Sequence, residues 1–388
     1  MAYYITEIDK KGNIAVDDTI LVKDYPATAG SKMLESFKPL FSAEAVERLI
    51  SAGYTLSGKT AVGEFGLDLY GETSANDICA AATLVKEGSV KAALNVDLNG
   101  TPRRAAALTD TVFVKPTYGT VSRYGVISCA ASGEQIGVTA KTADTAAEVL
   151  TVIAGHDEKD GTSLKDAKCD YNTAVSAKGM KIALVKELYD AADDSVKAKI
   201  DSAVAAYKKA GAEVEEISLE ILREIRAAWT ILMAAETTNN LSRFDGVKYG
   251  HRAEKYKNID ELYVNSRTEG FEFLTKATIL YGSDVLSKGR YEDCYDKALK
   301  IRRIAVEALT ALFESYDALL APAYSKAEFE GYEKEDAFKK VFEESVFTAP
   351  ASITGMPAVV AKGVQLMGDY FCDGKLLGLG KVLEKEEA

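Results

Sequence analysis

Histidine is nearly missing from this sequence, which has only His156 and His251 among its 388 residues. So low a number argues against a histidine-rich metal site and against a serine-histidine triad. His156 follows a helical pattern in the segment Ala-Gly-His-Asp, where we expect a capping or packing role and not a catalytic one. We therefore expect no metal and no other cofactor.

Paired cysteines and long apolar runs are also missing. Five cysteines are scattered along the chain without a Cys-x-x-Cys pair, so neither a disulfide framework nor a zinc site is indicated. No window has the roughly 18 uninterrupted apolar residues of a membrane span, and the first residues are too polar for a signal peptide. We expect a cytoplasmic protein with reduced thiols and no contact with a membrane.

An excess of positive charge is lacking as well. The chain has 47 lysines and arginines against 59 aspartates and glutamates, a formal net charge of −12. Binding to phosphates needs a basic patch, and none of the Lys/Arg clusters is long. We expect no direct binding of nucleic acid, and if tRNA is involved, another protein chain should hold it.

What the sequence does contain is enough apolar material for a large core, because 47% of its residues are hydrophobic. The length allows one large α/β domain or two smaller ones, and we favour a single domain over residues 1–388. A buried strand over Met180–Val185, a helix over Asp194–Ala210 and a strand over Ala212–Ile217 predict a βαβ unit.

Further segments follow the same alternation of strand and helix patterns. Strands are predicted over Ala2–Thr6, Thr19–Val22, Val90–Val96, Val112–Val114 and Tyr316–Ala323, with a last strand region in Thr348–Val360. Helices are predicted over Ala43–Ala52, Ala143–Ala154, Leu219–Thr237, Phe271–Leu286 and Tyr291–Ser315, and another begins at Ala80.

Several of these segments carry recognisable motifs. The run Lys115–Leu164, which begins KPTYGTVSRYG, closely resembles the amidase signature family and, within it, the A subunits of the tRNA-dependent Glu/Asp amidotransferases. The segments Arg243–Val247 (RFDGV) and Tyr316–Ala323 (YDALLAPA) match the same pattern. The resemblance implies a mixed α/β fold, a central twisted sheet covered by helices on both faces, and a chain trimmed at both ends relative to the family. It also implies protein partner subunits.

The family cleaves amide bonds with a serine nucleophile in a DTGGSIR turn, a cis-serine and a lysine base. Counting back 115 − 101 = 14 positions from Lys115 puts the nucleophile position on Thr101, and Asp97, Gly100 and Arg103 keep the frame of the turn. The resemblance gives Arg103 a structural role beneath the turn. The oxyanion-hole position falls on Leu98, Asn99 and Gly100.

The other two catalytic positions are altered or displaced. The cis-serine position lies 101 − 77 = 24 residues before Thr101, on Asp77, although an apparent deletion leaves Ser74 or Thr73 as alternatives. The strand predicted over residues 19–22 would deliver Lys23 as the counterpart of the base. A carboxylate beside this lysine would favour its charged form, so a Lys23–Asp77 ion pair would silence the base.

Two functions remain open. The first is a catalytically degenerate homologue of the A subunits of these amidotransferases: a pseudoenzyme retained as a scaffold, partner or ligand-binding protein. The second is an active amide hydrolase or glutamine-dependent amidotransferase component, with Thr101 as nucleophile and Lys23 as base. The joint loss of serine nucleophile, cis-serine and glycine-rich loop favours the first.

Overall fold

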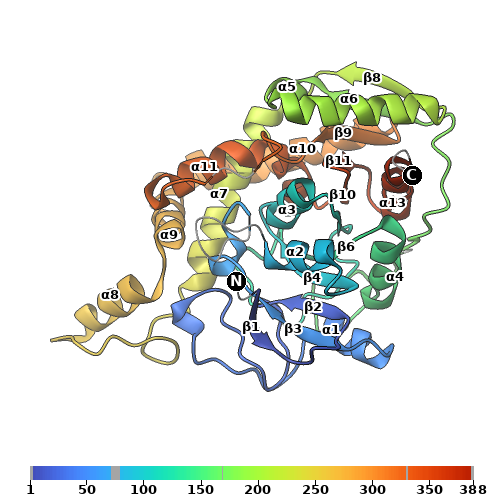
Figure 1. Cartoon of the computed structure of the whole chain (residues 1–388). Helices are drawn as coiled ribbons and strands as arrows, with labels where there is room; N and C mark the ends of the chain where they lie inside the picture. The colour runs from blue at the N-terminus through green and yellow to red at the C-terminus, as the bar shows by residue number, and fades with distance from the viewer. Residues whose placement is uncertain (1–2, 71–78, 168, 329–330, 386–388) are drawn as a thin grey trace.

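One large β-sheet organises the molecule. A computed structural model describes residues 3–70, 79–167, 169–328 and 331–385. Among these residues, eleven strands form a single sheet in the order β1-β3-β2-β4-β6-β5-β10-β11-β9-β7-β8 (Figure 1). The strands are β1 (Tyr4–Glu7), β2 (Ile14–Asp17), β3 (Leu56–Thr60), β4 (Ala92–Asp97), β5 (Val112–Lys115), β6 (Gln135–Ala140), β7 (Lys181–Val185), β8 (Glu213–Ile217), β9 (Ala318–Pro322), β10 (Ala358–Ala361) and β11 (Val364–Met367).

The sheet is mixed, as predicted. Strand β2 runs parallel to both β3 and β4, and β7 runs parallel to both β8 and β9. The pairs between β4 and β9 are antiparallel, through β6, β5, β10 and β11. Two parallel groups are therefore joined by an antiparallel centre.

Helices cover the sheet on both faces (Figure 1). The α-helices are α1 (Glu44–Ser51), α2 (Ala80–Glu87), α3 (Thr101–Thr109), α4 (Ala143–Ile153), α5 (Lys186–Asp190), α6 (Asp194–Lys209), α7 (Leu222–Leu241), α8 (Ile259–Gly270), α9 (Phe273–Val285), α10 (Lys297–Phe313), α11 (Ala337–Glu344), α12 (Ala349–Thr354) and α13 (Asp373–Glu384). Short 3₁₀ turns are η1 (Lys32–Leu34), η2 (Glu64–Gly66), η4 (Lys334–Asp336) and η5 (Ser345–Phe347), and η3 (Tyr291–Asp296) is a π-helical turn.

The alternation of side chains along the strands explains why both faces are buried. On β2, Ile14 and Val16 join a core with residues of α1, α4, α6 and α13, whereas Ala15 between them joins a core with residues of α2 and α3. On β4, Leu94 belongs to the first of these cores and Ala93 to the second. Both faces of these strands are apolar because each one packs against a helical layer.

The strand predicted over Thr19–Val22 is wrong, because the strand in this region is β2, which ends at Asp17. The Asp17 carboxylate accepts the Thr19 N–H at 2.7 Å, and the Asp17 carbonyl accepts the Ile20 N–H at 3.0 Å. This aspartate turn ends the strand. Beyond it, Ile20 makes only an isolated bridge to Val126.

Two other predicted segments are divided in the structure. The helix predicted over Tyr291–Ser315 begins as the π-helical turn η3 before it continues as α10. The strand region predicted within Thr348–Val360 contains helix α12, and β10 follows only after Gly355 has ended the helix with a φ of 77°. The apolar residues of α12 are buried on all sides, so an uninterrupted apolar run did not distinguish a helix from a strand here.

Candidate functional site

The carboxyl end of β2 lies beside the carboxyl end of β4, because the two strands are parallel neighbours. Asp17 ends β2, and its carboxylate accepts the Val96 N–H of β4 at 3.1 Å as well as the Thr19 N–H and hydroxyl. Burial raises the pKa of Asp17, although these hydrogen bonds oppose the shift. The two strand ends are thus joined by a buried carboxylate.

The next residue in the chain, Asp18, forms a buried ion pair. The Asp18 carboxylate contacts the Lys59 ammonium at 3.0 Å, and both side chains are fully buried. Burial lowers the pKa of Lys59, while Asp18 counteracts this effect. Asp18 also accepts the N–H and hydroxyl of Thr28, so its oxygens are used within the protein.

The turn after β4 is held together by Asp97 and Arg103. One carboxylate oxygen of Asp97 accepts the Gly100 N–H at 3.0 Å, and Arg103 donates to both oxygens at 2.7 and 3.1 Å. Arg103 is fully buried and also donates to the Thr348 carbonyl and the Ser352 hydroxyl. Gly100 has a φ of 87°, and a Cβ there would lie 2.4 Å from Thr348. A glycine is therefore required at this turn.

Thr101 begins helix α3 directly after the turn. Its side chain is buried, and its hydroxyl donates a 2.6 Å hydrogen bond to the carbonyl of Asp68. Pro102 follows in the first helical turn, where it supplies no N–H. One turn later, Arg104 donates to the Leu69 carbonyl at 3.4 Å. The same face of α3 thus holds the segment 68–69 through both residues.

Asn99 and Trp229 fill the other side of the turn. The indole N–H of Trp229, on α7, donates to the Asn99 side-chain oxygen at 2.9 Å, and both residues are about 1% exposed. A Cβ on Gly133 would lie 2.1 Å from the same indole ring. Leu98 is buried in the apolar cluster that contains Trp229. The space between the turn and residues 130–133 is therefore occupied by protein side chains.

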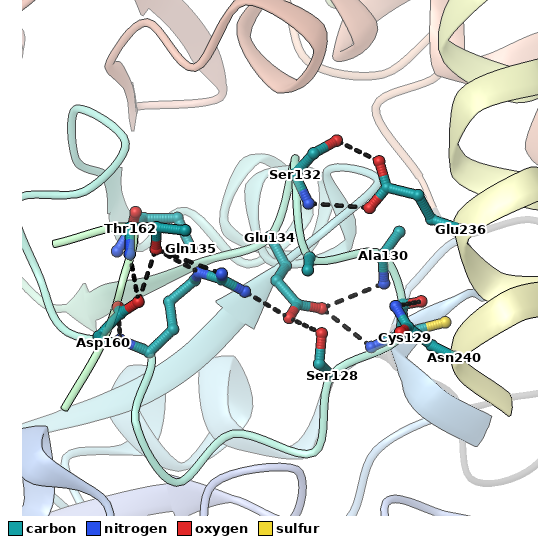
Figure 2. A network of polar contacts seen from close by, with 12 residues as sticks. Ser128, Cys129, Ala130, Ser132, Glu134, Gln135, Asp160, Thr162, Glu236 and Asn240 are labelled. Carbon is teal, nitrogen blue, oxygen red and sulfur yellow. Dashed lines mark hydrogen bonds and ion pairs between the residues drawn. The ribbon is translucent and has the colours of Figure 1, made fainter. Parts of the chain in front are cut away.

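The loop at residues 128–134 is itself fixed by two carboxylates (Figure 2). Glu134 accepts the Cys129 and Ala130 N–H groups at 3.0 and 3.3 Å and the Ser128 hydroxyl, and it pairs with Arg123 at 2.9 Å. From α7, Glu236 accepts both the N–H and the hydroxyl of Ser132. Arg302 of α10 donates to the hydroxyl and carbonyl of Ser132 at 3.0 Å each.

Among the residues described, no hydrogen bond or ion pair joins the predicted catalytic positions Lys23 and Thr101. Lys23 lies on an exposed loop after β2, and its backbone N–H donates to the Ser42 hydroxyl at 3.1 Å. The prediction that a strand delivers Lys23 is wrong for the reason given above. Asp77 and its alternatives Ser74 and Thr73 lie outside the described residues, so the Lys23–Asp77 ion pair stays a prediction.

Sequence reasoning overlooked Asp17, Glu134, Trp229, Glu236 and Arg302. For Asp17 a signal was present, since Ile-Ala-Val-Asp-Asp is an apolar run that ends in two acids. Trp229 is the only tryptophan of the sequence, but its partner Asn99 lies 130 residues away. Glu236 and Arg302 contact Ser132 across 104 and 170 residues, so no local pattern indicated them.

A cavity of about 590 Å³ lies beside this region, and Thr101 does not line it. It is bounded by η1, the end of β3, η2 and the first turn of α9, and Asp68 contributes to its wall. One of its two buried acids is Glu64, which accepts the Ser31 hydroxyl at 2.5 Å and the Glu272 N–H at 2.8 Å. Burial raises the pKa of Glu64 to about 7, although these hydrogen bonds oppose the shift.

Glu64→Gln is expected to stabilise the protein more as pH rises. The folded pKa of about 7 lies above the ordinary 4.5, so the stability contributed by the acid is fully present below 4.5 and is lost as pH rises through 7. Each pKa unit corresponds to about 1.4 kcal/mol, which sets an upper limit of about 3 kcal/mol on the gain. Urea unfolding at about pH 5 and about pH 8 measures it.

The matched control for this prediction is Glu35→Gln, at an exposed acid that also lines the cavity. It should change stability little at either pH, because an exposed carboxyl is solvated in both states. An equal effect of Glu64→Gln at the two pH values would contradict the prediction.

Metal-binding clusters and membrane helices are both missing from the part of the chain that the structure describes. Within these residues, no three histidine, cysteine, aspartate or glutamate side chains are grouped as a metal site requires. In the same ranges, no helix combines the length and apolarity needed to cross a membrane.

Known proteins resemble this chain over most of its length. The family model described as Amidase matches residues 13–77 and 80–377. The A subunit of the glutamyl-tRNA(Gln) amidotransferase of Halothermothrix orenii is 36% identical, over 96% of this chain and 84% of its own length. The protein of the same name from Latilactobacillus sakei is 35% identical, over 96% and 82%.

Solved structures show the same relationship as the sequence comparisons. The crystal structure of the A subunit of the glutamyl-tRNA(Gln) amidotransferase from Thermotoga maritima superposes with a TM-score of 0.80 at 28% identity, covering 99% of this chain and 87% of that one. A peptide amidase from Stenotrophomonas maltophilia shares the fold, with a TM-score of 0.75 at 22% identity over 96% and 82% of the two chains.

Proposed function

Because the chain belongs to the Amidase family, we propose that it is a catalytically inactive relative of the amidotransferase A subunits, retained as a scaffold, partner or ligand-binding protein. The observation that carries the proposal is the state of Thr101. At the nucleophile position of the family turn, its hydroxyl is buried and donates to the backbone carbonyl of Asp68. A hydroxyl that serves as a structural donor is not positioned to lose its proton to a base.

The second support for the proposal concerns the lysine base that is expected at the end of a strand. The family requires a lysine at a strand end, neutral for part of the time, close to the nucleophile. Here β2, which runs parallel to β4, ends at Asp17 and is followed by Asp18, and the Asp17 carboxylate already accepts hydrogen bonds from Thr19 and Val96. The buried Lys59 is engaged by the Asp18 carboxylate at 3.0 Å, which counteracts the lowering of its pKa by burial. Neither group contacts Thr101 by a hydrogen bond within the described residues.

The third support for the proposal concerns the backbone N–H groups that would stabilise an oxyanion. A glycine-rich turn offers backbone N–H groups to the developing negative charge. In this chain Asn99 replaces a glycine of that turn and holds the Trp229 indole in the adjoining space. Pro102 has no N–H to donate. The bond network of Asp97 and Arg103 is retained, which fits the structural role that we predicted for Arg103.

The alternative, an active hydrolase using Thr101 and Lys23, has weaker support. Lys23 is exposed on a loop and has no ion-pair or side-chain hydrogen-bond partner among the described residues, so nothing holds it at a nucleophile. Burial is also what lowers a lysine's pKa enough for it to act as a base.

A serine-reactive fluorophosphonate probe tests the proposal at the atom concerned. The probe forms a bond only with an activated hydroxyl, so we expect mass spectrometry to find no adduct on the peptide that contains Thr101. An active amidase of the family, treated in parallel, should be labelled. An adduct on Thr101 that disappears in Thr101→Ala would overturn the proposal.

We also propose that any role in translation requires a partner protein. The relatives are named as subunits of an amidotransferase, and the net charge of −12 gives this chain no general attraction for phosphates. The isolated chain is therefore expected not to retard tRNA in a gel-shift experiment at physiological salt. Tight tRNA binding by the chain alone would contradict this expectation.

A further inference from the structure

The cavity beside η2 has an acidic interior. Two of its lining residues are buried acids, Glu64 and Asp68, each 7% exposed. The other charged residues of its described lining are exposed, namely the acids Glu35 and Glu272 and the lysines Lys32 and Lys334. The two exposed acids and the two lysines offset one another in water, so the buried pair sets the charge inside the cavity.

The Glu64 side chain is held at the cavity wall by a strained turn. The next residue, Phe65, has a φ of 54°, which residues other than glycine rarely adopt. Its N–H donates to the Ala29 carbonyl at 2.8 Å, and its ring stacks on Phe244 with the centroids 5.8 Å apart. A strained residue persists only where the surrounding structure holds it. The apolar core therefore keeps the Phe65 ring, and Glu64 faces the cavity.

A buried hydroxyl in the cavity wall is left without a hydrogen bond. Thr275, in the first turn of α9, is 0% exposed and lines the cavity. It lies close enough to the Glu64 carboxyl to oppose the rise in the pKa of that acid. Among the described residues, however, no partner meets the geometry of a hydrogen bond to the Thr275 oxygen. A polar group that is buried without a partner is costly, and a ligand in the cavity would satisfy it.

The second acid approaches the backbone beside Glu64. A Cβ added to Gly63 would lie 2.3 Å from the Asp68 carboxyl, so the glycine is what allows this approach. Gly63 lines the same cavity. Three groups that accept hydrogen bonds thus line one wall region: the carboxyls of Glu64 and Asp68 and the hydroxyl of Thr275.

These three groups suit an organic cation. Among the described residues Glu64 forms no ion pair, and its hydrogen bonds come from the Ser31 hydroxyl and the Glu272 N–H. A primary ammonium has three N–H donors, one for each acceptor. A volume of about 590 Å³ is that of a small-molecule site. A metal ion is not indicated, since the described residues hold no group of three potential ligands.

We propose that this cavity binds the ammonium group of a small organic amine, with Glu64, Asp68 and Thr275 as the acceptors. The inference rests on the proposed function in one respect, because it specifies the ligand-binding role named there. It does not depend on the chemistry of Thr101, which does not line the cavity.

Three probes with the same alkyl chain test the recognition of the ammonium group. Binding of hexylammonium, hexyltrimethylammonium and hexanol is measured by ligand-observed NMR titration at about pH 8. Hexylammonium should bind. Hexyltrimethylammonium has the charge but no N–H, and it should bind about tenfold more weakly or worse, because hydrogen bonds to charged groups are lost. Hexanol has no charge and should not bind measurably.

Two variants remove the acceptors one at a time. Glu64→Gln should weaken hexylammonium binding by about tenfold or more. Thr275→Val keeps the shape of the side chain and removes its hydroxyl, so it should weaken hexylammonium but leave hexyltrimethylammonium unchanged. The matched control Glu35→Gln removes an exposed carboxylate of the same lining and should change the affinity by less than about threefold. Circular dichroism melting shows whether each variant is folded.

The affinity for hexylammonium should also rise with pH. Glu64 has a pKa of about 7, and the ammonium favours its ionised form, so binding should be about tenfold tighter at about pH 8 than at about pH 6. An alkylammonium, like a lysine side chain, stays charged at both values. The other titratable groups that line the cavity are Glu35, Asp68, Glu272, Lys32, Lys334 and Tyr332. Glu64→Gln should abolish the pH dependence, which assigns it to Glu64.

The proposal would be overturned by a natural chain that does not bind hexylammonium at about pH 8, or by a folded Glu64→Gln variant that binds it unchanged. Equal binding of hexyltrimethylammonium would contradict the three acceptors. These failures would leave the inactivity of Thr101 standing. Conversely, a fluorophosphonate adduct on Thr101 would end the proposed inactivity and leave amine binding in place.

Discussion

Glutamine incubated with the purified chain is expected to release ammonia no faster than it does with Thr101→Ala. In an active enzyme of this family, loss of the nucleophile abolishes the reaction, so equal rates mean that Thr101 contributes nothing. Under the proposed function, the physical reason is that three contributions are compromised together: the base, the relay hydroxyl and the oxyanion donors. One oxyanion donor alone is worth on the order of a hundredfold or more in rate.

The comparison with Thr101→Ala is more informative than a low rate by itself. Groups that act as a unit fail together once one of them is lost, so the three deficits need not multiply. A coupled ammonia assay calibrated with an active amidase sets the detection limit. Ammonia release by the natural chain that Thr101→Ala removes would make Thr101 a working nucleophile and would end the pseudoenzyme proposal.

Restoring single groups is expected to recover little activity. Thr101→Ser combined with Asp77→Ser places serine at both positions predicted for the family motif, but Asp17 still occupies the strand end beside β4. Asn99 still holds Trp229 against the turn, and Pro102 still lacks an N–H. Full recovery by this pair of substitutions would show that the strand end and the turn are competent as they stand.

Asp97→Asn is expected to destabilise the fold by about 3–5 kcal/mol, the usual result of leaving a buried charge unpaired. Asp97 and Arg103 are both fully buried, and the carboxylate accepts two guanidinium hydrogen bonds at 2.7 and 3.1 Å. The asparagine amide would direct one N–H toward the guanidinium, so a donor would face a donor. Urea unfolding followed by circular dichroism gives the change in unfolding free energy.

Two variants make this stability prediction specific. Glu148→Gln breaks the exposed pair between Lys91 and Glu148, 2.6 Å long, and should cost less than about 1 kcal/mol because solvent screens it. Asp97→Asn/Arg103→Met removes both charges and should recover part of the loss, since no unpaired charge remains. A loss under about 1 kcal/mol for Asp97→Asn would mean that water reaches Arg103.

Much of the fold was predictable from local sequence. The strand and helix at Met180–Val185 and Asp194–Ala210 came from apolar periodicity, and the structure confirms them as β7 and α6 within a mixed sheet. The turn that begins at Asp97 was predicted through the family resemblance, and the contacts of Gly100 and Arg103 to Asp97 are local, within six residues. Short-range geometry of this kind is encoded in adjacent residues.

The candidate site depended on contacts that no local pattern contains. Thr-Ile-Leu-Val is as apolar and β-branched as Ile-Ala-Val, so propensity could not decide which segment forms the strand beside β4. Parallel pairing of β2 with β4 and the turn at Asp17 decided it, and Lys23 was left on an exposed loop.

The sequence by itself determined the alternation of strands and helices, because this pattern rests on residues that are close in the chain, and the family resemblance added the Asp97–Arg103 frame. Only the tertiary structure decided that Asp17 lies at the strand end, that Trp229 reaches Asn99 across 130 residues, and that the Thr101 hydroxyl donates to the Asp68 carbonyl across 33 residues. Each of these contacts forms where segments distant in sequence are buried together. Burial then obliges every polar group to find whichever partner lies nearest in space.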